Sequence, residues 1–369
     1  MKIFVIVVTY KGHRWYNKCF SSLQKQSIPV QVVVVDNASN DGTIEFIRKD
    51  FSEFVLIESR ENLGFGRANN IGMRYALEHD CDYLFLNNQC ARYVEQQLHG
   101  KKIDVVHSNS AITTVGTNIA QRLRVPHIWH IREFLDLDFN VSVYGGRQRL
   151  VNQLNTAAAR ICISQAVCHY WKLLKNNTFV VPDVIFYSPF TRKQQKFFLF
   201  TATVVSEKKG ADVAVQAFRL SRLHKEGYSL LIVGSCTPEM QEYLFTIAGE
   251  SKDFISFENY STQMVLYYQQ AVALLMRSPC EALGRVTVEA MLAECPVIGR
   301  DTGGTMEIIG PNRTGFLFST TEECAKCMRT IVSMNTSEIV MNAKMFAMEH
   351  FGDKQFKYRI HQVYKSVLP

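Results

Sequence analysis

Two glutamates stand eight positions apart in the stretch EALGRVTVE, which runs from Glu281 to Glu289. An apolar run of strand length, Ala271–Arg277, precedes them, and a helix-forming run, Ala290–Ala293, follows. This order predicts a strand, a loop that carries Glu281, and a helix with Glu289 about one turn from its start. The unpaired N–H groups and partial positive charge of such a helix start suit a phosphate.

The spacing then assigns each glutamate a different partner. Glu289 would accept hydrogen bonds from a ribose, and Glu281 would face the group that the phosphate carries. The competing interpretation is two surface glutamates around an ordinary amphipathic helix, and the bare spacing favours it because glutamate is common. The choice between the two therefore depends on the flanking residues.

The flanking residues closely resemble the signature of the retaining family-4 glycosyltransferases of the GT-B fold. That signature has two glutamates separated by seven residues, followed by a P-V-I strand and a GG loop. The segments that carry the resemblance are Ser278–Met291, Cys295–Gly299 and Asp301–Thr305. It implies that Glu289 holds the ribose of a nucleotide-sugar donor and that Glu281 contacts the transferred sugar.

The same resemblance implies the rest of a donor site. The backbone of Gly284, Arg285 and Val286 would meet the diphosphate, and Lys209, after a strand at 197–205, matches the family's phosphate-binding lysine. Many relatives carry Gly-Arg where this chain has Thr203-Val204, so we expect either weaker donor binding or the use of another cation, for which Arg285 is the candidate.

A histidine completes the implied site. His130 lies in VPHIWHIREF (125–134), near the carboxyl end of a predicted strand, where ligands gather in open parallel sheets. By position it matches a histidine that family-4 enzymes place beside the transferred sugar. His107, on the preceding predicted strand, is interpreted as structural.

The first ninety residues show a different resemblance. Apolar runs at 3–8, 32–35, 54–57 and 83–86 alternate with helical patterns, as in a parallel sheet. Three segments, Val8-Thr9-Tyr10, Asp36–Thr43 and Asn62–Gly72, together resemble the start of a family-2 glycosyltransferase of the GT-A fold. In that family the positions of Thr9, Asp36 and Arg67 line the nucleotide pocket, so these residues are a possible vestigial nucleotide site.

The family-2 resemblance stops after residue 88. The family has an acidic metal-binding motif after the fourth strand, but this chain has Asn87-Asn88-Gln89, which offers no carboxylate to a divalent cation. The spelling Asp80-Cys81-Asp82 stands before that strand and is interpreted as element-end polarity. We therefore expect no metal and no cofactor other than the nucleotide-sugar co-substrate.

Together the two resemblances predict an α/β hybrid of GT-B type: two Rossmann-type, doubly wound domains that face a cleft. The predicted N-terminal domain is 1–185, with a GT-A-like, family-2-like front at 1–90 and a family-4-like second half at 91–185. A donor-binding domain follows at 186–350, and a terminal helix at 351–369 is expected to pack back on the N-terminal domain. Both parent folds open with βαβαβ, so the splice keeps right-handed crossovers.

Composition excludes several other classes. Of 369 residues, 47% are hydrophobic and 20% charged, as in ordinary globular proteins with room for two domains. No apolar run approaches the roughly 18 residues of a membrane span, and the N-terminus reads as a core strand rather than a signal peptide. Ten scattered cysteines, with one isolated CxxC at 324–327, indicate reduced thiols and no zinc site. The net charge is +7, but no run of basic residues is dense enough to indicate binding of nucleic acid.

The predicted function is transfer of a sugar, of hexosyl type, from a nucleoside-diphosphate donor to a hydroxyl acceptor with retention. The acceptor would be a saccharide or a lipid-linked sugar in cell-surface polysaccharide or glycolipid synthesis. The location would be the cytoplasm, with peripheral contact at the inner face of the membrane. The sequence leaves open the donor base, the sugar and the oligomeric state.

Three alternatives stay open. The chain would bind nucleotide-sugar without transferring it if the replaced front has removed the acceptor pocket. It would be a metal-dependent GT-A enzyme if Asp36 and Arg67 form the site. It would fold poorly if the junction between the two resemblances is not native.

Overall fold

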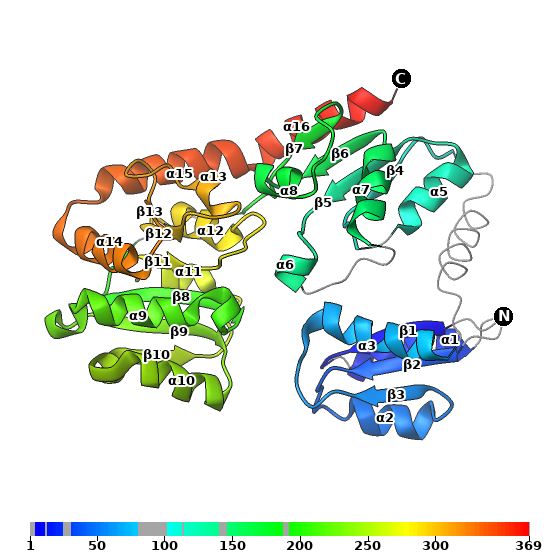
Figure 1. The fold of residues 1–369 in the computed structure, drawn as a ribbon, viewed down its shortest axis with the longest axis horizontal. Helices are drawn as coiled ribbons and strands as arrows, with labels where there is room; N and C mark the ends of the chain where they lie inside the picture. The colour runs from blue at the N-terminus through cyan, green and yellow to red at the C-terminus, as the bar shows by residue number, and fades with distance from the viewer. Residues whose placement is uncertain are drawn as a thin grey trace. The chain divides into compact units, whose positions relative to one another are not determined.

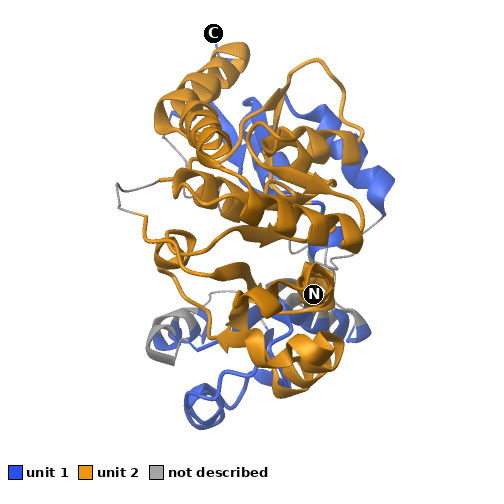
Figure 2. Ribbon diagram, turned by 90° about the vertical axis from the view of Figure 1, so that its left-hand side faces the viewer, with its two compact units in different colours: residues 1–129, 134–158, 368 blue, residues 130–133, 159–367, 369 orange. Residues whose placement is uncertain are grey.

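A computed structural model describes residues 4–11, 13–24, 31–79, 102–112, 114–139, 146–186 and 192–368 of the chain (Figure 1). The chain divides into two compact units (Figure 2). The first consists of residues 1–129 and 134–158, and the second of residues 130–133 and 159–367. No helix in the described part of the chain is both long and apolar enough to cross a membrane.

The chain opens with three strands that alternate with three helices. The elements are β1 (Phe4–Thr9), α1 (His13–Gln24), β2 (Gln31–Asp36), α2 (Thr43–Asp50), β3 (Val55–Glu58) and α3 (Gly64–Glu78). The strands form a parallel sheet in the order β1-β2-β3. Apolar residues cover both faces of β2, which explains its unbroken valine run. The first three predicted strands are confirmed, whereas the fourth (83–86), Asp80–Asp82 and Asn87–Gln89 lie outside the described residues.

A four-stranded parallel sheet follows in the sequence, in the order β4-β5-β6-β7. Its elements are β4 (Val106–Ser108), α5 (Val115–Leu123), β5 (His127–Ile131), α6 (Asp136–Phe139), α7 (Arg147–Thr156), β6 (Ala159–Cys162), α8 (Gln165–Tyr170) and β7 (Thr178–Val180). The fully buried Trp171 donates its indole N–H to the carbonyl of Glu133 at 2.9 Å. This bond fixes the segment that follows β5.

The C-terminal sheet is doubly wound. Its strands are β8 (Phe197–Val204), β9 (Ser229–Ser235), β10 (Ile255–Glu258), β11 (Leu274–Met276), β12 (Val297–Arg300) and β13 (Phe316–Phe318). They are all parallel and lie in the order β10-β9-β8-β11-β12-β13, so the direction of winding reverses between β8 and β11. Ligands of such sheets bind outside the carboxyl ends of the strands at this switch point. The predicted strand at 271–277 is confirmed over residues 274–276.

The helices of this sheet are α9 (Ala211–Ser221), α10 (Pro238–Ala248), α11 (Met264–Tyr268), α12 (Arg285–Leu292), α13 (Thr305–Ile308), α14 (Thr321–Ser333), α15 (Ser337–Phe351) and α16 (Asp353–Val367). Short 3-10 turns lie at Glu207–Lys209, Leu223–Glu226 and Gly249–Phe254. Helices α9, α10 and α14 share one hydrophobic core with the sheet. Helix α16 contacts β6, and its Val363 is fully buried. The helix begins at Asp353, two residues inside the predicted terminal segment 351–369.

Candidate functional site

Two helices begin at the switch point of the C-terminal sheet, one after β8 and one after β11. Their N-caps, Gly210 and Gly284, both have left-handed backbone, with φ of 77° and 87°. Neither helix has a side-chain cap. The first N–H groups of α12, those of Arg285 and Val286, therefore have no intrahelical acceptor, whereas the first N–H of α9, that of Ala211, donates to the carbonyl of Ser206 at 3.3 Å. A free helix start such as that of α12 attracts an anion.

Glycine at 210 allows α9 to start against the end of β11. A Cβ at this position would lie 2.7 Å from the carbonyl oxygen of Arg277 and 2.8 Å from its Cβ. The Arg277 side chain turns into the core, where its guanidinium carbon lies 4.1 Å from the ring centroid of Phe318. Burial lowers the pKa of Arg277. Its cation thus belongs to the core beneath the site, a role that the sequence analysis missed.

The two predicted residues Lys209 and Glu281 lie together across the switch point. The Lys209 Nζ is 3.8 Å from Glu281 Oε2, and the two side chains are 44% and 24% exposed. An ion pair with this exposure is weakly held, because water screens it and each side chain loses freedom to form it. Both groups therefore remain available to a ligand, the lysine for an anion and the carboxylate for hydroxyl donors.

The loop that carries Glu281 rests on the predicted GG loop, which follows β12. The Gly304 N–H donates to the carbonyl of Glu281 at 2.7 Å. Gly303 has φ of +59°, and a Cβ there would lie 2.6 Å from that same carbonyl oxygen. A Cβ on Gly304 would lie 2.5 Å from the carbonyl oxygen of Ala282. The two glycines therefore set the position of Glu281 through backbone contact.

Glu289 is the fifth residue of α12, as the sequence predicted, and is partly exposed. The hydroxyl of Tyr268, on α11, donates to its Oε2 at 3.2 Å. Burial, and then the neighbouring Glu289 carboxylate, raise the pKa of Tyr268 well above its ordinary value, so the tyrosine stays protonated and donating. Tyr268 orients Glu289, and no sequence pattern pointed to it.

Two further sequence expectations concern cations near the site. Arg285 is the first residue of α12 and its side chain is exposed. Thr203 and Val204, which replace the family's Gly-Arg, are exposed at the end of β8. Among the described residues of the segment that follows β8, Lys209 forms the ion pair with Glu281. The use of Arg285 as a second cation stays a prediction.

His130 lies in a different sheet, on β5, and is 4% exposed. Beyond the end of this strand, Arg132 forms an ion pair with Asp183. The pKa of the nearby His127 is lowered to about 4, first by burial and then by the charge of His107, so His127 is neutral near pH 7. A place for His130 beside a transferred sugar stays a prediction.

The structure brings together two of the three residues of the possible vestigial site. The buried Thr9 hydroxyl donates to Asp36 Oδ1 at 2.8 Å, and the hydroxyl and N–H of Ser39 donate to the same carboxylate at 2.5 and 3.0 Å. Asp36 is fully buried, so its carboxylate serves the loop after β2. Arg67 lies exposed on α3.

The described residues include no cluster of three or more His, Cys, Asp or Glu side chains that would hold a metal ion. The CxxC at 324–327 lies in α14, where Cys324 is fully buried and contacts Arg277. Burial raises the pKa of the Cys324 thiol to about 11, so it is a core thiol. Metal independence stays a prediction.

Two family models match the chain. Residues 185–345 match the model for glycosyl transferases group 1, and residues 4–154 match the model for glycosyl transferase family 2. The second match extends past residue 88, where the recognisable motifs end. The two parts of the chain therefore match two different glycosyltransferase families, as the sequence predicted.

The chain is also similar to individual proteins. A probable sucrose-phosphate synthase of Thermosipho melanesiensis is 27% identical over 164 residues, which cover 41% of this chain and 38% of that protein. The chain thus spans well under half the length of the curated relative that it matches. HepE of Anabaena, solved in complex with UDP, has a TM-score of 0.64 at 18% identity, with 99% and 100% of the two chains covered.

Two more solved structures share the fold at similar levels. They are a sucrose-phosphate synthase of Thermosynechococcus elongatus (TM-score 0.63, 14% identity, 99% and 98% of the chains covered) and the lipopolysaccharide outer core galactosyltransferase WaaB (0.62, 15%, 100% and 100%). The fold of this chain is therefore of the GT-B type, with parallel α/β sheets.

Proposed function

We propose that this chain, which joins segments of two glycosyltransferase families, transfers a sugar from a nucleoside diphosphate to a hydroxyl acceptor with retention of configuration. The observation that carries the proposal is the switch point between β8 and β11. There the start of α12, which has no side-chain cap, the Lys209–Glu281 pair, and Glu289 with its hydrogen bond from Tyr268 come from the same unit of the structure.

Each group has a distinct task in this proposal. The N–H groups at the start of α12 and the Lys209 ammonium bind the diphosphate and stabilise the charge that develops on it as the sugar leaves. Arg285 adds a second cation. Glu289 accepts hydrogen bonds from the ribose, and Glu281, with His130, holds the transferred sugar. No step needs a metal ion, because helix starts and side-chain cations supply the positive charge.

The donor base that we propose is uracil. The support is fold similarity to HepE, whose structures contain UDP, UDP with glucose, or UDP-glucose. The transferred group would then be a hexosyl group, as in the galactosyltransferase WaaB. The acceptor would be a saccharide or a lipid-linked sugar in cell-surface polysaccharide or glycolipid synthesis. The chain would work in the cytoplasm, and its net charge of +7 would draw it to the inner, anionic face of the membrane.

The test is release of UDP from UDP-glucose and UDP-galactose in EDTA, with water or added saccharides as acceptor. We expect slow, metal-free release that an acceptor accelerates. Asp36→Asn should leave the rate within about twofold of wild type, because the buried Asp36 carboxylate serves the loop after β2. Asparagine is a better control than alanine, since its oxygen can still accept from the hydroxyls of Thr9 and Ser39, and only the acceptor of the Ser39 N–H is lost.

Three results would reject parts of this account. UDP binding without release on any acceptor would show a nucleotide-sugar-binding protein that does not transfer. Release that appears only with manganese and disappears in Asp36→Asn would place the reaction in the family-2 front. Absence of a cooperative unfolding transition in the wild-type protein would show that the chain folds poorly at the junction between the two resemblances.

A further inference from the structure

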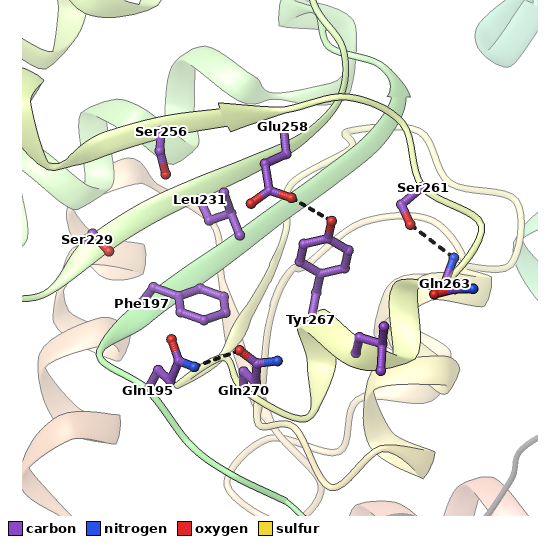
Figure 3. A pocket seen from close by; sticks show the side chains of 11 residues that line it. Gln195, Phe197, Ser229, Leu231, Ser256, Glu258, Ser261, Gln263, Tyr267 and Gln270 are labelled. Atoms are coloured by element: carbon purple, nitrogen blue, oxygen red, sulfur yellow. Dashed lines mark hydrogen bonds between the residues drawn. The ribbon is translucent and has the colours of Figure 1, made fainter.

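A pocket of about 430 Å³ lies on one face of the C-terminal sheet, over β8, β9 and β10 (Figure 3). The strand register shows which face it is. Phe197 pairs with Ser229, Leu231 with Ser256, and Val233 with Glu258, and side chains two residues apart on a strand share a face. The lining residues of the three strands therefore belong to one face, opposite to the residues that pack against α9 and α10.

This face is open because the element beside it is short. The connection from β10 to β11 contains α11, a helix of only five residues, which supplies Leu266 and Tyr267 to the pocket wall. A parallel sheet covered on both faces has apolar residues on both sides of each strand. Here β10 instead presents Ser256 and Glu258, both exposed, on the open face. The polar residues of β10 therefore indicate that this face is open to solvent and is not normally covered by a helix.

Four polar side chains of the pocket form two hydrogen-bonded pairs, and the Ser261 hydroxyl accepts from the Gln263 N–H at 3.1 Å. The Tyr267 hydroxyl donates to Glu258 Oε2 at 2.5 Å, and Gln195 Nε2 donates to Gln270 Oε1 at 2.8 Å (Figure 3). A carboxylate has about four acceptor positions and each amide two donors and two acceptors, so the pairs use only part of their capacity. The remaining donors and acceptors suit a ligand that offers several hydroxyl groups.

The charge and shape of the lining narrow the ligand class. None of the described residues that line the pocket is a cation, and Glu258 is the acidic one, so a phosphate or nucleotide would be repelled. The rings of Phe197 and Tyr267 add apolar surface against which the C–H face of a sugar ring can pack. Clefts of about 300–1,000 Å³ are the usual size for small-molecule sites.

We propose that this pocket binds a neutral saccharide, separately from the donor site. The lining chemistry carries the inference, whereas use of the pocket to retain a saccharide acceptor or product rests on the proposed function. Helix α11 contacts both sites, because Tyr267 bonds to Glu258 in the pocket and the adjacent Tyr268 bonds to Glu289. The two sites are therefore neighbours that share a helix but no ligand-binding side chain.

The test is saturation-transfer NMR with maltotriose, cellotriose and tri-N-acetylchitotriose, in the presence of saturating UDP. At least one trisaccharide should bind wild type with a dissociation constant on the order of 1 mM. Glu258→Ala should weaken binding at least roughly fivefold, as expected when a charged hydrogen-bond partner is lost. Ser256→Trp, which fills the pocket from an exposed position, should abolish it. Glu242→Ala, on α10 at the opposite face, is the matched control and should bind as wild type.

Calorimetric titration of each variant with UDP separates this proposal from the previous one. UDP affinity in Ser256→Trp should equal that of wild type. Absence of binding by all three trisaccharides, or binding unchanged by Ser256→Trp, overturns the pocket assignment. Failure of wild type to bind UDP overturns the donor site and leaves the saccharide result to stand by itself.

Discussion

Glu281→Gln is expected to lower the rate of sugar transfer by roughly 10²–10³-fold, the usual cost of removing one preorganised electrostatic group from an active site. Glutamine keeps the shape of the side chain and one acceptor oxygen but removes the charge that faces Lys209 at 3.8 Å. UDP lacks the sugar, so its dissociation constant should change by less than about threefold. The measurement is kcat with UDP-sugar beside calorimetric UDP binding.

The matched control for Glu281→Gln is Glu242→Gln, an exposed carboxylate on α10. It should leave both quantities unchanged. Equal losses of transfer and of UDP affinity in Glu281→Gln would show that Glu281 acts on the nucleotide rather than on the sugar. An unchanged rate would remove Glu281 from the site altogether.

Gly304→Ala should reduce transfer by about 10- to 100-fold although it adds one methyl group. The new Cβ would lie 2.5 Å from the carbonyl oxygen of Ala282 and 2.9 Å from Leu283 Cα, both backbone atoms. The Glu281 loop must therefore move, and displacement of a reacting group by about 1 Å costs on the order of 10²-fold. Overpacking should also lower the free energy of unfolding by about 1–3 kcal/mol.

Gly310→Ala separates the steric effect from the general effect of alanine. A Cβ on Gly310 would meet its nearest neighbours at 3.6 and 3.8 Å, which is ordinary contact. Both rate and stability should stay near wild type in that variant. If Gly304→Ala retains full transfer, the GG loop does not position Glu281.

The sequence predicted the parts of the site that depend on local order. Glu281 and Glu289 fall on a loop and a helix because a buried strand, a glycine with left-handed φ and a helix-forming run follow one another. The apolar runs of β8, β9 and β10 were also predictable, since strands buried in parallel sheets are continuous in hydrophobicity. These features need no knowledge of distant contacts.

Contacts between distant segments were not predictable in the same way. Tyr268 reaches Glu289 from a five-residue helix that has too few turns to show a period. Arg277 ends an apolar run and reads as strand-end polarity, yet it is buried against Phe318. The approach of Lys209 to Glu281 follows from β8 lying beside β11, a strand order that local pattern does not fix.

The family-2 front shows a further limit. Asp36 entered the possible vestigial nucleotide site only through the family-2 resemblance. In the structure it is fully buried and accepts bonds from Thr9 and Ser39. A carboxylate that organises its own loop has the same sequence signature as one that binds a nucleotide, because both need a polar strand end.

The most direct test of the donor site is calorimetric titration of the EDTA-treated protein with UDP and with GDP. Wild type should bind UDP at one site per chain. Glu289→Ala should weaken that binding by about 10- to 100-fold, from loss of charged hydrogen bonds worth roughly 1.5–3 kcal/mol. Glu289→Gln keeps an acceptor for the buried Tyr268 hydroxyl, so it should stay folded. Weaker UDP binding in this variant as well would show that lost folding is not the cause. UDP binding that survives in both variants, or that requires manganese, would contradict the account.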